Sequence, residues 1–73
     1  MVFNFPRTKF VDSKGLYGQV EHIGSEAEES HKASMTPDVY ATAMEIMDCL
    51  HSCETALRIC QEKYKVNLHE IRR

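Results

Sequence analysis

The longest pattern of apolar and polar positions runs over residues 37–64, a segment without internal Gly or Pro. At 100° per residue, its apolar side chains gather on one broad side of a helix. They are Val39, Ala43, Ile46, Met47, Leu50, Cys53, Leu57, Cys60 and Tyr64. Thr36 is placed to cap the first turn, and Pro37 and Asp38 suit the first helical positions. The pattern therefore predicts one long amphipathic helix.

A second helix is predicted before it, from about Gly15 to Lys32. Its apolar positions follow the i, i+4, i+7, i+11 spacing of one narrow face: Leu16, Val20, Ile23 and Ala27. The four residues Ala33–Thr36 form a joint short enough to fold the two helices into an antiparallel hairpin. Beyond the long helix, Asn67 and Glu70 have capping-box spacing, which predicts the start of a third helix at Leu68. The expected fold class is all-α.

Residues 1–14 contain three Phe and one Pro and show no helical period. We expect an extended N-terminal arm whose Phe side chains pack on the body or on a partner subunit. Arg7, Lys9 and Lys14 against the single acid Asp12 give the arm a net charge of +2, in a chain whose net charge is −2. Arg7, Lys9 and Lys14 are therefore candidates to bring positive charge to an anionic ligand, and Lys9 and Lys14 are candidates for contact with the substrate. Residues 15–73 form the helical domain, which ends in mid-pattern and is expected to be truncated there.

Composition excludes several classes of function. A net charge of −2 and a pI of about 6.0 argue against a general nucleic-acid binder. No apolar run approaches the roughly 20 residues of a membrane span, and the N-terminus lacks the apolar region of a signal peptide. Three cysteines within one predicted helix fit a reducing cytoplasm. A chain of 73 residues buries little apolar surface alone, so we expect a homodimer or homotetramer.

Two pairs of carboxylates flank the apolar sides of the hairpin. Glu26 and Glu29 lie one turn apart on the first long helix, and Glu45 and Asp48 lie one turn apart on the second. If the helices pack side by side, the four acids converge and repel one another unless a cation sits among them. Oxygen ligands suit Mg²⁺ or Mn²⁺, which can orient a polyphosphate and activate water for attack on phosphorus. The alternative is that these acids are ordinary solvated side chains on helix flanks.

Residues 25–29 (SEAEE), followed after 15 residues by residues 45–50 (EIMDCL), resemble a known signature. It is the E-x-x-E … E-x-x-D pattern of the MazG-like, all-α nucleoside triphosphate pyrophosphohydrolases. Residues 20–24 and 64–68 resemble the flanks of that pattern. The resemblance implies that helical hairpins pair into a homo-oligomeric four-helix bundle. It also implies that the four carboxylates bind Mg²⁺, and that a nucleoside or deoxynucleoside triphosphate is hydrolysed to the monophosphate and pyrophosphate.

The same resemblance assigns roles to single residues. Glu29 and Glu45 are expected to be the catalytic carboxylates of the set. Family members often carry a Lys and an Asn beyond the second acidic pair that reach the substrate, and Lys63 and Asn67 are candidates by residue type. Glu28 departs from the family, which often has Gly or a small apolar residue there. Aromatic residues are candidates to stack on the base: Phe3, Phe5, Phe10 and Tyr17.

Two other interpretations remain open. The cysteines Cys49, Cys53 and Cys60 share a helical face, and His22, His31 and His51 are nearby in sequence, which permits a zinc site. Core packing is favoured for these cysteines because the chain has no C-x-x-C motif and they lie within or beside the apolar stripe. The second functional hypothesis is a small non-catalytic helical dimer that acts as an adaptor or regulator.

Overall fold

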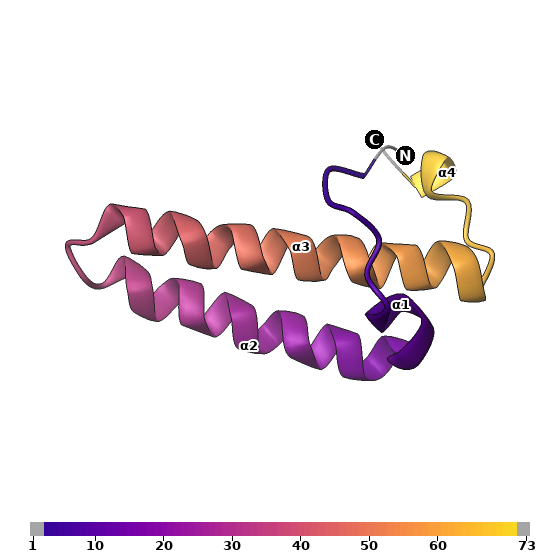
Figure 1. The fold of residues 1–73 in the computed structure, drawn as a ribbon, viewed down its shortest axis with the longest axis horizontal. Helices are drawn as coiled ribbons and strands as arrows, with labels where there is room; N and C mark the ends of the chain where they lie inside the picture. Colours follow the sequence, from indigo (N-terminus) through magenta and orange to yellow (C-terminus); the bar gives the residue numbers. More distant parts are fainter. Residues whose placement is uncertain (1–2, 72–73) are drawn as a thin grey trace.

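The computed structural model describes residues 3–71, which form helices and no strand. The elements are α1 (Phe10–Ser13), α2 (Leu16–Ser34), α3 (Val39–Lys63) and α4 (Leu68–Ile71). The two long helices, α2 and α3, lie antiparallel and side by side, with a tight turn at one end (Figure 1). The predicted all-α helical hairpin is confirmed. None of the helices in the described range is long and apolar enough to cross a membrane.

The ends of the long helix show which capping predictions hold. Asp38 caps α3, because its Oδ1 accepts a hydrogen bond from the Ala41 backbone N–H at 3.0 Å. The predicted cap by Thr36 is wrong, since the Thr36 hydroxyl donates to Ala33 O at 2.7 Å and so belongs to the end of α2. At the other end, Asn67 Oδ1 accepts from the His69 backbone N–H at 3.0 Å, and α4 begins at Leu68 as predicted.

The residues before α2 are more ordered than the expected extended arm. Phe10–Ser13 form a helical turn, α1, whose Val11 is 1% exposed. The segment before it crosses α3 (Figure 1). The Phe5 ring stacks on the His51 ring, with centroids 4.6 Å apart, and the Arg58 guanidinium lies over the Phe3 ring at 4.4 Å. Phe3 and Phe5 therefore pack on the body of the same chain. Of the two alternatives expected for the arm, packing on the body or on a partner subunit, the structure shows the first.

The buried core lies at the arm end of the hairpin. Its hydrophobic members come from α1, α3 and α4, and they are Val11, Ala56, Ile59 and Leu68. The N-terminal half of the predicted apolar stripe on α3 is uncovered: Ile46 is 53% exposed and Leu50 is 42% exposed. We call Val39, Ala43, Ile46 and Leu50 the open apolar face, and all four are exposed.

The shape of the single chain agrees with an uncovered face. Its accessible surface is 5392 Å², whereas a compact monomer of this mass exposes about 4,600 Å². Its radius of gyration is 13.5 Å, against about 11 Å for a compact domain of this length. The hairpin is therefore elongated and exposes more surface than a compact domain.

Three carboxylates near the arm should make stability depend on pH. Burial alone would raise the pKa of Glu54, but the N–H groups of Asn4 and Phe5, with the charge of Arg58, outweigh it and hold that pKa below its usual value. Hydrogen bonds from Arg7 likewise lower the pKa values of the carboxyls that it contacts, Asp12 and Glu62.

We therefore expect the free energy of unfolding to fall steeply on acidification. Because these pKa values are lower in the folded chain, the carboxylates stabilise the fold above their unfolded pKa values, and the contribution is lost as pH falls through the folded ones. The decline should begin below about pH 4.5, as measured by urea unfolding across a pH series. Arg7→Gln should flatten the acid limb, and an identical limb in that variant would contradict this explanation.

Candidate metal and substrate site

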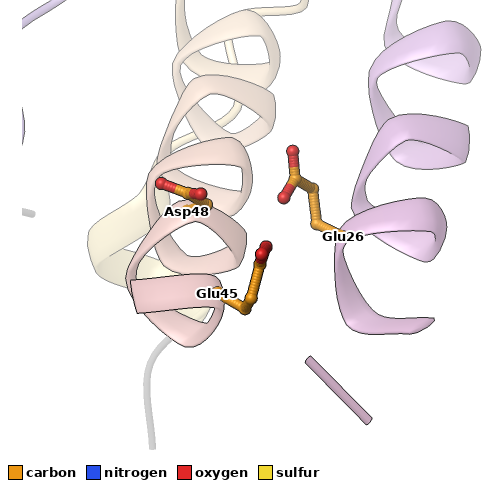
Figure 2. A group of neighbouring side chains, drawn as sticks. All are labelled: Glu26, Glu45 and Asp48. Atoms are coloured by element: carbon orange, nitrogen blue, oxygen red, sulfur yellow. The ribbon is translucent and has the colours of Figure 1, made fainter. Parts of the chain in front are cut away.

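Three of the four predicted acids meet between the two long helices. One carboxylate oxygen from each of Glu26, Glu45 and Asp48 lies within 4.8 Å of the other two. Glu26 reaches from α2 toward α3, which carries Glu45 and Asp48 (Figure 2). Glu26 and Glu45 are partly buried and Asp48 is exposed. We call these three residues the carboxylate cluster.

The hairpin register places the carboxylate cluster. Glu45 and Asp48 are three residues apart on α3, so they project from successive turns in nearly the same direction. Opposite them, Glu26 stands near the middle of α2. The register is fixed by Gln19, which is 3% exposed and whose Nε2 donates to the backbone oxygen of Ser52 at 3.0 Å. A buried hydrogen bond between the helices opposes sliding, because a shift would leave the amide unpaired.

Glu29 lies outside the carboxylate cluster. Its Oε1 is 4.0 Å from Lys32 Nζ, and its side chain is 58% exposed. The two acids of the first predicted pair therefore have different surroundings, Glu26 facing α3 and Glu29 beside a surface lysine. A metal-binding or catalytic role for Glu29 stays a prediction.

His22 is a neighbour of the carboxylate cluster that sequence reasoning did not assign to it. Its Nε2 lies 2.9 Å from Glu26 Oε1, one helical turn along α2. The signal in the sequence was the i, i+4 spacing of the two residues. This contact orients the Glu26 carboxylate and occupies one of its oxygens, so the other remains available to a ligand.

A cavity of about 310 Å³ adjoins the carboxylate cluster. Its walls come from α2, α3 and the segment around α1, and they comprise Thr8, Phe10, Lys14, Gln19, His22, Glu26, Asp48, His51, Ser52 and Thr55. Glu26 and Asp48 belong to both the cluster and the cavity. The volume is at the lower end of the range for small-molecule sites, about 300–1,000 Å³. A ligand in this cavity would therefore have its nearest end beside two of the three carboxylates.

Of the four basic or amide residues predicted to reach substrate, Lys14 lines this cavity. Its Nζ lies 5.6 Å from the centroid of the Phe10 ring. Lys63 instead donates from Nζ to the backbone oxygens of Asp12 at 3.3 Å and Lys14 at 3.2 Å, which ties the end of α1 to α3.

The other two predicted substrate contacts lie outside the lining of the cavity. Asn67 caps α4, and Lys9 is exposed immediately before α1. Substrate roles for Lys9, Lys63 and Asn67 stay predictions. Lys14 is thus the predicted positive group that the structure brings to the cavity beside the acids.

The aromatic candidates separate in the same way. Phe10 lines the cavity and is 50% exposed, with Lys14 Nζ over its ring at 5.6 Å from the centroid. Phe3 and Phe5 are already packed on Arg58 and His51. Tyr17 is 78% exposed and is not part of the cavity wall. Among the four, Phe10 has the position that stacking on a base in this cavity requires.

The cysteines lie elsewhere on the hairpin. Cys49 and Cys53 line a second groove, of about 340 Å³, with Ile46 and Leu50 of the open apolar face. Burial and the neighbouring Cys49 raise the pKa of the Cys53 thiol, which favours its neutral form. Within residues 3–71, the carboxylate cluster is the one group of acids, histidines or cysteines spaced to hold a metal ion. The described residues therefore offer no zinc site built from cysteine and histidine.

Comparison of the chain with models of protein families, with curated proteins and with solved structures found no match. The family assignment is therefore not made, and the acidic signature remains a resemblance in residue spacing. What is established is a small all-α chain with a long helical hairpin and a carboxylate cluster across it.

Proposed function

We propose that this chain hydrolyses nucleoside or deoxynucleoside triphosphates to the monophosphate and pyrophosphate, with Mg²⁺ or Mn²⁺ bound at the carboxylate cluster. The observation that carries the proposal is the meeting of Glu26, Glu45 and Asp48 across the hairpin, beside a cavity. Three neighbouring carboxylates repel one another, and a divalent cation would relieve that repulsion. The MazG-like spacing of the acids supports the same reaction.

The donor set fits a hard divalent cation, because all three groups offer carboxylate oxygens. When bound, such an ion supplies charge neutralisation for the phosphates and a lowered pKa for water. The chain's own residues position the substrate. His22 orients Glu26 from within α2, and Lys14 places an ammonium group on the cavity wall, where it would bind a phosphate oxygen. Phe10 presents its ring to the same space.

The proposal includes a homodimer in which two hairpins form a four-helix bundle through the open apolar face. The face consists of side chains from one side of α3, and a single chain leaves all of them exposed. Water contact at these positions is unfavourable by about 25 cal/mol per Å² of apolar surface. A second copy offers a matching surface by two-fold symmetry, which is the commonest arrangement of soluble oligomers.

Pyrophosphate release tests the reaction directly. The chain would be incubated with each of the common nucleoside and deoxynucleoside triphosphates and Mg²⁺, and Glu45→Gln should lower kcat/KM by about 100-fold, corresponding to about 3 kcal/mol of transition-state stabilisation. Glu21→Gln is the matched control, because it makes the same charge change at an exposed position of α2 outside the cluster. Equal rates in the two variants would contradict the assignment.

Metal binding can be separated from turnover by thermal melting. Mg²⁺ at 100 times its dissociation constant should stabilise the chain by about 2.7 kcal/mol through mass action. Glu45→Gln should remove that gain and Glu21→Gln should keep it. A chain that shows neither an ion-dependent melting temperature nor pyrophosphate release would favour the alternative function, a non-catalytic helical dimer that acts as an adaptor.

A further inference from the structure

The N-terminal segment is held on α3 through its own backbone. Glu54 is 6% exposed, and both of its carboxylate oxygens accept the Asn4 N–H at 2.9 Å. Its Oε1 also accepts the Phe5 N–H at 2.9 Å, and Arg58 donates from a guanidinium nitrogen to the Phe5 carbonyl oxygen. Hydrogen bonds to charged groups are stronger than those between neutral partners. A buried acid and a base thus fix the backbone at Asn4 and Phe5.

Side chains strengthen the same attachment. His51, Glu54 and Arg58 follow one another at i, i+3 and i+7, so they form a stripe along α3. The stripe carries the stacked Phe5 ring at one end and the Phe3 ring at the other. The segment is consequently bound along α3 at several consecutive points.

Beyond this attachment, the segment becomes one wall of the cavity. Thr8 and Phe10 line the cavity together with Lys14. Glu26 and Asp48 of the carboxylate cluster line the same cavity. The Thr8 hydroxyl oxygen and His51 Nε2 are buried polar atoms for which no residue in the described range supplies a hydrogen bond. Buried polar atoms left unpaired cost free energy.

We propose that the N-terminal segment, through Thr8 and Phe10, forms the wall of the cavity that meets the nucleoside part of the substrate, and that Glu54 and Arg58 are positioning residues that hold this wall in place. The inference rests on the proposed function, because it takes the phosphates to lie at the carboxylate cluster. With the phosphates there, the nucleoside extends toward Thr8 and the half-exposed Phe10, whose aromatic ring suits contact with a base.

The first test follows the arm itself in the full-length chain. Glu54→Gln keeps the size of the side chain but removes its charge, and hydrogen exchange of the Asn4 and Phe5 amides should accelerate about tenfold or more. Glu21→Gln should leave these rates unchanged. If circular dichroism shows that the Glu54→Gln variant has lost helix, the Arg58→Gln variant is used in its place. Arg58 is only partly buried, so this substitution should disturb the fold less.

The second test follows the ligand, with the four deoxynucleoside monophosphates as probes in the presence of Mg²⁺. In the unaltered chain, NMR signals of the Thr8 and Phe10 amides should shift on titration. Glu54→Gln should weaken binding of the monophosphates about tenfold and raise KM for the triphosphate by a similar factor, with kcat changed by less than about twofold. The stabilisation by Mg²⁺ should persist in this variant, because Glu54 lies outside the carboxylate cluster.

The outcomes separate the two proposals. If Mg²⁺ stabilises the chain but no monophosphate shifts Thr8 or Phe10, the inference about the arm is wrong and the metal site stands. If the Asn4 and Phe5 amides exchange faster in the Glu54→Gln or Arg58→Gln variant but its affinity for the monophosphates is unchanged, the inference about the arm is also wrong. If Mg²⁺ does not stabilise the unaltered chain, the proposed function fails, and the inference that rests on it falls as well.

Discussion

Replacing Ile59 by alanine should lower the free energy of unfolding by about 2–5 kcal/mol. Ile59 is 0% exposed, and within the described residues the fully or nearly buried hydrophobic side chains are few: Val11, Ala56, Ile59 and Leu68. Truncation would leave a cavity in the buried core at the arm end of the hairpin, in a domain too small to have a large reserve of stability. Urea unfolding followed by far-UV circular dichroism, at one protein concentration, measures the effect.

Ile71→Ala is the matched control for this prediction. It makes the same chemical change on α4 at a side chain that is 63% exposed, so the expected loss is below about 1 kcal/mol. Equal losses at Ile59 and Ile71 would mean that the arm end of the hairpin is not the stabilising core. A concentration-dependent midpoint would in addition report coupling between folding and self-association.

The periodicity of the sequence was sufficient to predict the hairpin, but it did not locate the core. The apolar stripe on α3 is continuous from Val39 to Tyr64, and its period is the same along its whole length. Buried hydrophobic residues occur only in the C-terminal half of α3, at Ala56 and Ile59, whereas along the open apolar face α2 reaches no further than the rim of the groove that Ala27 and Ser30 share with Ile46 and Leu50. A helical period indicates which side of a helix is apolar. Whether other elements cover that side depends on contacts between residues distant in sequence.

The difference between helical spacing and contacts distant in sequence also explains which parts of the candidate site were predicted. Glu26, Glu45 and Asp48 follow from spacing on two helices that a short joint makes antiparallel, so their meeting was predictable. The difference between Glu26 and Glu29 was not, because it depends on the rotation of α2 against α3, and that rotation is set by buried contacts such as Gln19 with Ser52.

The attachment of the arm left no sequence signal that we can identify. Glu54 and Arg58 are four residues apart on a helix, which reads as an ordinary surface ion pair. Their partners are backbone groups of Asn4 and Phe5, about 50 positions earlier in the chain. Backbone groups are present at every residue, so a contact to them cannot be read from residue types.

Leu50→Arg should convert the proposed homodimer into a monomer. Leu50 lies on the open apolar face and is 42% exposed in the single chain, so the substitution should leave the hairpin folded. In a dimer formed through this face, however, a guanidinium would be placed among apolar side chains without a partner, which costs several kcal/mol. The dimer dissociation constant should therefore rise by about 100-fold or more.

Sedimentation equilibrium over a range of concentrations measures this change, and circular dichroism checks that the helices persist. Met35→Arg is the control, because it adds the same charge at an exposed position in the turn after α2, outside the four residues of the open apolar face. An unaltered chain that sediments at 8.4 kDa at every concentration would contradict the homodimer. A Leu50→Arg dimer as stable as the original would instead place the contact on another surface.

The position of Leu50 also connects this prediction with the candidate site. Asp48 lies two residues away on α3, about 160° around the helix, and it lines the cavity beside the carboxylate cluster. A partner on the open apolar face therefore leaves that cavity accessible. Leu50→Arg should accordingly weaken self-association while Mg²⁺ still raises the melting temperature. Loss of both together would show that the carboxylate cluster requires the second copy for its stability.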